Sequence, residues 1–200
     1  GSAVSAITQG YGTSVSEPSA PTKTGYTFGG WYSDVGLSSA VSWPYTVTAS
    51  DPTFYAKWTI NSYTVTFNSN GGSGSMSPQS ADYNVATALT SNSYTRTGYT
   101  FAHWNTAAND SGTSYADGAS YPFTSSATLY AQWNINSYTI TFNSNGGSAV
   151  TAITQNYNTS VSAPSAPTKA NYTFDGWYSD AGLSSAVSWP YTVTASDPTF

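Results

Sequence analysis

Side chains that could perform catalysis or bind a metal are few in this 200-residue sequence. His103 is the only histidine, and the absence of cysteine excludes disulfides and thiolate ligands. A histidine that acts as a base or a ligand needs polar partners, and Asp110 and Asp117 are the nearest acids. Calcium sites gather several oxygen ligands in a short loop, which only Asn109–Ser111 with Ser114 and Asp117 approaches. We therefore predict no catalytic residue, no metal site, no cofactor and no enzymatic activity.

Aromatic residues in two long loops offer a different chemistry, because exposed rings can stack on sugar rings. Trp43 and Trp189 each precede a proline, and Tyr121 precedes Pro122 in a corresponding loop. The residues that this hypothesis makes candidate ligand contacts are Trp43, Tyr45, Trp189, Tyr191 and Tyr121. The alternative, which we favour, is that these rings cover the hydrophobic core. The third loop has Tyr121 where the other two have Trp. Keeping an aromatic residue while changing its identity supports a packing role.

Two modifications are conceivable from local sequence. Asn109, Asn158 and Asn171 each begin an Asn-x-Ser/Thr sequence, the acceptor for N-linked glycans. Lys57 lies in an expected core strand, where a lysine–asparagine or lysine–aspartate crosslink could form. Its counterpart is Gln132, so such a crosslink is not common to all copies.

Composition narrows the function classes. Only 6% of the residues are charged, against roughly 25% in an ordinary soluble domain. Four basic residues and a net charge of −5 leave no basic surface for nucleic acid. No apolar run approaches the roughly 20 residues that span a bilayer, so we expect no membrane span in this segment. Aromatic residues make up 16%, and with abundant Thr and Val they favour strands.

The sequence is built from internal repeats. Residues 1–54 and 147–200 align without gaps and differ at eight positions, namely 5, 10, 12, 17, 24, 25, 29 and 35. A diverged copy lies between them, and a Tyr-Thr-Phe-x-x-Trp box recurs every 73 residues at Tyr26–Trp31, Tyr99–Trp104 and Tyr172–Trp177. We predict repeat 1 (residues 1–62, without its first strand), repeat 2 (63–137, complete) and repeat 3 (138–200, without its last strand).

Each complete repeat is expected to contain four strands. Tyr63–Phe67 alternates large apolar residues with Thr, which is typical of a half-buried strand, and Asn-Gly follows as a turn. The other strands are expected at Ala152–Tyr157, Tyr172–Tyr178, Thr53–Trp58 and their copies. The connections Thr59–Ser62 and Asn134–Ser137 are too short for flexible tethers. We therefore expect repeats stacked end to end with restricted hinge motion.

The ordered motifs resemble the Listeria–Bacteroides repeat, the family that includes the B-repeats of internalin B. The resemblance rests on Tyr-Thr-Val-Thr-Phe-Asn-Ser-Asn-Gly-Gly, Pro-Thr-Lys-x-Gly-Tyr-Thr-Phe-x-Gly-Trp-Tyr and Phe-Tyr-Ala-Lys-Trp. It implies a mainly β fold with a minor α contribution: small β-grasp-like modules, each a mixed four-stranded sheet with a short crossover helix or turn. Repeat 2 departs from the pattern at Arg96, at Ala102-His103 and in a longer loop at Asn105–Ser120. The resemblance implies no catalytic residues.

Together these features favour a structural repeat segment of an extracellular or cell-surface bacterial protein, serving as a stalk or fibre body. Its expected partners are identical or similar repeats, joined end to end. The alternative is an adhesive module that binds a cell-wall or host glycan, or another host-surface ligand, through the loop aromatics. An exposed aromatic cluster at equivalent places in successive repeats would distinguish the adhesive module from the stalk.

Overall fold

A computed structural model describes residues 1–200, and its regular secondary structure consists entirely of short β-strands. None of its segments forms a helix with the length and apolarity needed to cross a membrane. The strands are β1 (Ser14–Val15), β2 (Tyr26–Tyr32), β3 (Tyr45–Thr46), β4 (Tyr55–Ile60), β5 (Ser62–Asn68), β6 (Gln79–Asp82), β7 (Thr87–Ala88), β8 (Tyr99–Asn105), β9 (Ser114–Tyr115), β10 (Ser120–Tyr121), β11 (Ala127–Ile135), β12 (Ser137–Ile140), β13 (Ile153–Asn156), β14 (Ser160–Val161) and β15 (Tyr191–Thr192).

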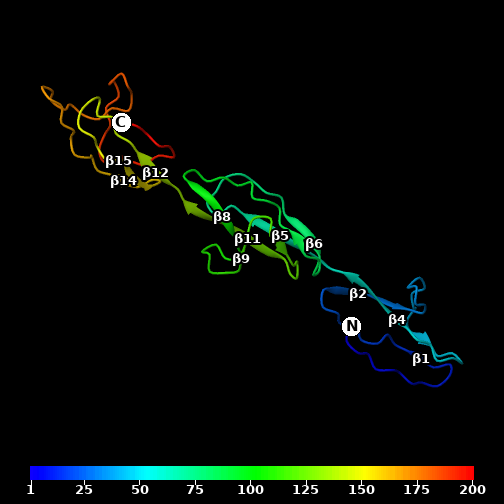
Figure 1. The fold of residues 1–200 in the computed structure, drawn as a ribbon. Coiled ribbons are helices and arrows are strands. Elements are labelled where there is room, and N and C mark those ends of the chain that lie inside the picture. Colours follow the sequence, from blue (N-terminus) through cyan, green and yellow to red (C-terminus); the bar gives the residue numbers. More distant parts are fainter. The chain divides into compact units, whose positions relative to one another are not determined.

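The chain divides into two compact units. Unit 1 comprises Gly1–Thr66, Pro78–Thr90 and Gly118–Thr128. Its strands pair antiparallel as β2 with β4, visible in Figure 1, β1 with β3, β5 with β6, and β7 with β10. A register shift interrupts the β2–β4 ladder between Phe28 and Trp31, where Gly30 has a φ of 102°. Glycine tolerates this conformation because it has no Cβ.

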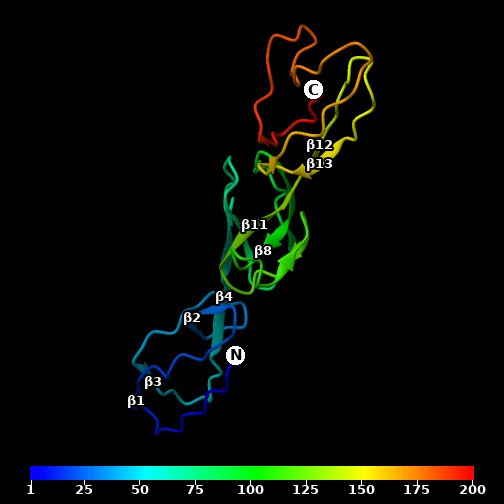
Figure 2. The same ribbon diagram turned by 90° about the vertical axis from the view of Figure 1, so that its left-hand side faces the viewer.

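Unit 2 comprises Phe67–Ser77, Ser91–Asp117 and Leu129–Phe200. Strands β8 and β11 lie side by side in it (Figure 2), and their antiparallel register shifts between Gln132 and Trp133. Strand β9 extends this ladder from β8, while β12 pairs with β13 and β14 with β15. An isolated parallel bridge joins Thr141 to Thr199.

The largest sheet has five strands in the order β6-β5-β11-β8-β9. It has one strand more than the expected four, because β9, from the long loop of repeat 2, adds to its edge. The mainly β class is thus confirmed. No helix forms, so the expected crossover helix is absent. In repeats 1 and 3 this stretch holds Pro18, Pro21, Pro164 and Pro167, which disrupt helical hydrogen bonding. The β-grasp assignment and the three domain boundaries remain predictions.

The third strand expected in repeat 3 does not form. Residues 172–178 carry only isolated bridges, whereas the near-identical Tyr26–Tyr32 forms β2. The difference lies in pairing, because β2 is hydrogen-bonded to β4 and residues 172–178 have no strand beside them. Conversely, Ile153–Asn156 forms β13 against β12, while the matching residues 7–10 of repeat 1 form no strand.

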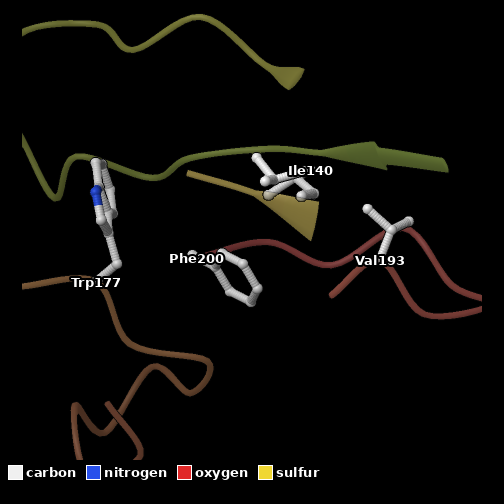
Figure 3. Packing of buried hydrophobic residues seen from close by; sticks show 5 residues of the cluster. Ile140, Trp177, Val193 and Phe200 are labelled. Atoms are coloured by element: carbon white, nitrogen blue, oxygen red, sulfur yellow. The ribbon is translucent and has the colours of Figure 1, made fainter. Parts of the chain in front are cut away.

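Large aromatic and branched side chains form the core of unit 2. In repeat 3 the buried residues Ile140, Trp177, Val193 and Phe200 pack together (Figure 3), and Val161 completes their cluster. The portion of unit 2 from repeat 2 buries Phe67, Tyr94, Trp104, Leu129 and Ala131. Unit 1 has a smaller set of buried hydrophobic residues, Val65, Leu89, Tyr121 and Phe123, all from repeat 2. In repeat 1 only Pro21 among the hydrophobic residues is buried, while Phe28, Trp31 and Trp58 are partly exposed.

Candidate functional site: repeat junctions and loop aromatics

The connection between repeats 1 and 2 is held by a central asparagine in unit 1. The backbone N–H of Asn61 donates to the Gly25 carbonyl at 2.9 Å, and its own carbonyl accepts from the Tyr83 N–H at 2.7 Å. Its side-chain oxygen accepts from the Thr27 hydroxyl at 2.6 Å. Asn61 is thereby bonded to residues of both repeats that it connects.

An aromatic contact accompanies these hydrogen bonds. The Tyr83 ring meets Tyr26 of repeat 1 and Tyr63 of repeat 2 edge-on, at centroid distances of 6.4 and 6.2 Å. It also lies directly on Gly25, where an added Cβ would overlap the ring. Gly25 is buried and has a φ of 76°, so both its conformation and its lack of a side chain are required there.

The connection between repeats 2 and 3 repeats this arrangement in unit 2. The Asn136 N–H donates to the Gly98 carbonyl at 2.9 Å, and the Tyr157 N–H donates to the Asn136 carbonyl at 2.8 Å. The Thr100 hydroxyl donates to the Asn136 side chain at 2.7 Å. The Tyr157 ring meets Tyr99 and Tyr138 edge-on at 6.2 and 6.5 Å and lies on buried Gly98, which again has a φ of 76°. Two separate connections therefore share one design.

The loop aromatics of repeat 1 pack on a neighbouring phenylalanine. Trp43 and Tyr45 are half-buried and lie 5.7 and 4.9 Å from Phe54, both in edge-on geometry. Repeat 3 has the same arrangement, with Trp189 and Tyr191 at 6.1 and 4.9 Å from the buried Phe200. These rings contribute to packing while each keeps part of its surface in contact with solvent.

The third loop places its aromatic residue differently. Tyr121 is only 6% exposed and meets buried Phe123 edge-on at 5.1 Å. Little of its ring is available to a ligand, unlike those of Trp43 and Trp189. The assignment of the five aromatic residues to ligand contact remains a prediction.

A shallow groove of about 230 Å³ lies beside Trp189 in unit 2. Phe174, Trp177 and Tyr178 line it together with Trp189, and the Asp175 side chain contributes a polar group. The Asp175 carboxylate accepts a hydrogen bond from the Tyr178 hydroxyl at 2.9 Å, which raises the pKa of Tyr178 above 10.0. The groove thus combines aromatic faces with a carboxylate.

The only histidine belongs to a structural network in the loop of repeat 2. His103 Nε2 lies 2.8 Å from Asp110 Oδ1, which also accepts from the fully buried Asn105 side chain at 2.8 Å. Asp117 instead accepts from the Asn92 N–H at 2.8 Å. The structure contains no group of three or more histidine, aspartate or glutamate side chains that could hold a metal ion.

Two equivalent aspartates organise the loops after the Trp-Tyr strand. The backbone N–H groups of Ser38 and Ser39 donate to Asp34 at 3.1 and 2.7 Å, which lowers the pKa of this carboxyl below 3.8. In repeat 3 the backbone N–H of Ser184 leads a matching set of donors that lowers the pKa of Asp180. Both aspartates therefore act as local loop caps.

Lys57, the candidate for a crosslink, lies on β4 near a tyrosine. Its Nζ is 3.4 Å from the Tyr32 hydroxyl and 4.9 Å from the centre of the Tyr32 ring. Both contacts are noncovalent and involve the same neighbouring strand. The Tyr32 hydroxyl and ring therefore stabilise the ammonium group of Lys57, which is half-buried.

Sequence reasoning identified the short connections but missed the residues that organise them. It assigned no role to Gly25 or Gly98, and it placed Tyr157 only at the end of an expected strand, with Tyr83 in the copy. One signal was available in the sequence: Asn61 and Asn136 occupy the same place in the two connections, each followed by Ser-Tyr-Thr.

Tandem β-rich repeats joined by short, hydrogen-bonded connections define the class of this protein. The Listeria-Bacteroides repeat domain matches residues 1–57, 63–132 and 138–200, so the chain belongs to this family. The family resemblance read from the motifs is thereby confirmed. No solved structure matches the chain.

Longer proteins contain segments similar to this chain. A "Putative Gly-rich membrane protein" of Evansella cellulosilytica is 37% identical over 192 residues, which is 93% of this chain and 21% of that protein. A "Putative membrane protein" of the same organism is 35% identical, covering 90% of this chain and 26% of its own length. "Internalin H" of Listeria monocytogenes is 35% identical over 65% of this chain and 23% of its own length. The chain therefore spans about a quarter or less of these relatives.

Proposed function

We propose that the chain is a structural repeat segment of an extracellular or cell-surface bacterial protein, serving as a stalk or fibre body and performing no catalysis. The names of the relatives support the location, since two are called membrane proteins and the third is an internalin. The family match over all three repeats supports the role of a repeated spacer.

The observation that carries the proposal is the duplicated connection. Asn61 and Asn136 each hold the repeat before and the repeat after them through backbone hydrogen bonds of 2.7–2.9 Å. A tether whose only task is to join independent domains needs no such bonds. A spacer that must keep its repeats in line does need them, because each bond restricts rotation about the connection.

Distance measurements between spin labels test this role. The sequence has no cysteine, so single cysteines can be introduced at exposed Ser16 in repeat 1 and Ser125 in repeat 2, both within unit 1. A narrow distance distribution is expected, and it should broaden in Asn61→Gly. A broad distribution in the otherwise unchanged chain, like that of a flexible linker, would refute the stalk.

The repeats themselves are the proposed partners in such a stalk, joined end to end. Identical or similar repeats would be added along the chain or supplied by other copies. Sedimentation velocity of the full chain over a range of concentrations tests the second source. A single monomeric species at all concentrations would leave only covalent extension.

A second candidate function is adhesion to a cell-wall or host glycan. The groove beside Trp189 favours it, because Phe174 adds aromatic surface and Asp175 adds a hydrogen-bond acceptor. Titration of the full chain with soluble glycan fragments, followed by tryptophan fluorescence, tests this function. Binding that Trp189→Ala abolishes would support it, and an unchanged spectrum throughout the titration would oppose it.

A further inference from the structure

The two tyrosine–glycine contacts are formed where glycine precedes the Tyr-Thr-Phe box. Gly25 and Gly98 are buried beneath Tyr83 and Tyr157, and both tyrosines are half-buried. Repeat 3 has Asn171 at the same place, with the same left-handed backbone at a φ of 62°. An asparagine therefore adopts the required backbone conformation, but its Cβ would occupy the space that the tyrosine ring fills in the other two repeats.

Sequence differences between repeats 1 and 3 concentrate at these positions. The two copies differ at eight of 54 aligned positions. Four of the eight, at 10, 12, 24 and 25, flank Tyr11 and Tyr26, the repeat 1 counterparts of Tyr157 and Tyr99. Packing in the body of a repeat does not account for this concentration, because these positions lie at its two ends.

The half of the junction contributed by the box is present in every repeat. A cation lies over the ring of the box tyrosine, with Lys23 Nζ 3.8 Å from the Tyr26 centroid and Arg96 Cζ 4.0 Å from that of Tyr99. Lys169 keeps the same place at 4.6 Å from Tyr172, although Tyr172 is 71% exposed. Asn171, with Ala170 before it, is thus the altered part of a junction surface whose Lys–Tyr contact is kept.

We propose that the residue before the Tyr-Thr-Phe box encodes the kind of junction that a repeat forms with the repeat following it. Glycine specifies a junction packed by the tyrosine that follows the second strand of the next repeat, as Tyr83 and Tyr157 do, and asparagine specifies a junction without that ring. The surface around Lys169 and Tyr172 therefore fits a successor that does not place a tyrosine on residue 171. The proposal rests on the structural role proposed above and assigns a selectivity to it.

The same reasoning assigns a partner to Tyr11. It is the counterpart of Tyr83 and Tyr157, which each lie on the glycine of the preceding repeat. The surface that it fits is the end of a repeat of this family in which glycine precedes the box and a lysine or arginine lies two residues before that glycine. The end of repeat 3 does not meet this description, because Asn171 stands in place of the glycine.

Two matched substitutions test the code in the full chain. Gly25→Asn and Gly12→Asn each introduce the residue that repeat 3 carries at that position, at φ values of 76° and 73°. The two differ in surroundings, because a Cβ on Gly12 meets nothing within 4 Å whereas one on Gly25 overlaps Tyr83. We expect Gly25→Asn to abolish the nuclear Overhauser contacts between the Tyr83 and Tyr26 rings and to broaden the Ser16–Ser125 distance distribution, and Gly12→Asn to do neither.

A double substitution tests whether the effects of Gly25→Asn come from the clash with the Tyr83 ring or from general unfolding. In a Tyr83→Ala background the ring is absent, so Gly25→Asn should cost no more stability than Gly12→Asn. Retention of the Tyr83–Tyr26 contacts in Gly25→Asn, or an equal cost of that substitution with and without the ring, would overturn the code. Neither result would change the Ser16–Ser125 distance distribution of the unsubstituted chain. A narrow distribution there would still support the stalk.

Discussion

Asn105 is the only fully buried polar side chain, and its replacement should uncouple the long loop of repeat 2 from the sheet. Its amide nitrogen donates to Asp110 at 2.8 Å, Ser114 at 3.0 Å and the Gly112 carbonyl at 3.3 Å. Its oxygen accepts from the backbone N–H groups of Ala107 at 2.8 Å and Gly112 at 3.0 Å. One side chain therefore makes five hydrogen bonds across residues 105–114.

The expected cost of Asn105→Ala follows from these bonds. An intramolecular hydrogen bond contributes about 1 kcal/mol net, and a buried group left unpaired costs about 1–3 kcal/mol. Ala107 is half-buried and Gly112 is exposed, so water can replace part of what the backbone loses. We expect a loss of about 2–4 kcal/mol in the free energy of unfolding. With a urea slope of roughly 2 kcal/mol per molar, the middle of the usual range, the midpoint should fall by about 1–2 M.

Urea unfolding monitored by tryptophan fluorescence measures this loss, since Trp104 adjoins the network and is buried. Asn109→Ala is the matched control, because exposed Asn109 lies in the same loop and bonds only to Ser111. Asn105→Asp adds a test by pH. Its carboxylate would face Asp110 in a buried place, so the destabilisation should grow as pH rises and the new carboxyl ionises. Equal midpoints for Asn105→Ala and Asn109→Ala would refute the reasoning.

Three further outcomes are expected. The pKa values of Asp34 and Asp180 are lowered in the fold, so their loop capping is complete above the unfolded value near 3.8 and is lost as pH falls through the folded values. Amide shifts of Ser39 and Ser185 should follow this titration, and Asp34→Asn should remove it at Ser39 only. Tyr94→Phe should cost about 1 kcal/mol in urea unfolding, because the buried hydroxyl donates to the Phe67 carbonyl at 2.9 Å; an unchanged midpoint would contradict the bond. Trp104→Ala should cost about 3–5 kcal/mol and Trp104→Phe less than half of that, because the buried Nε1 makes no hydrogen bond that the substitution could remove; equal costs would contradict this account.

Strands with a clear alternating pattern were predictable from sequence where their partners are present. Tyr63–Phe67 lies within β5, and the Tyr-Thr-Phe-x-x-Trp boxes lie in β2 and β8. The same box forms no strand at residues 172–178, although the local sequence is nearly unchanged. Strand formation depends on a hydrogen-bonded neighbour, and a pattern within one segment carries no information about that neighbour.

The candidate loop aromatics were located by sequence, but their degree of exposure was not. Trp43 and Trp189 lie on phenylalanines that follow them by 11 residues, whereas Tyr121 lies in the interior beside Phe123. The junction was inaccessible to sequence reasoning for a related reason. The requirement for glycine at residues 25 and 98 comes from a ring that is 58 or 59 residues away in the chain.

Repeats 1 and 3 act as natural controls for the glycan hypothesis. Their Trp-Pro-Tyr loops form the same short ladders, β1 with β3 and β14 with β15, so the loop conformation is a local property. In repeat 3 the groove adds Phe174 and Asp175 to the surroundings of Trp189.

If the loop aromatics suffice for binding, each chain should bind two equivalent glycan fragments, and Trp43→Ala and Trp189→Ala should each remove one site. If the groove is required, one site should remain in Trp43→Ala and none in Trp189→Ala. Calorimetric titration of the three proteins distinguishes these cases. Unchanged binding in both variants would exclude both interpretations, because each of them requires Trp189.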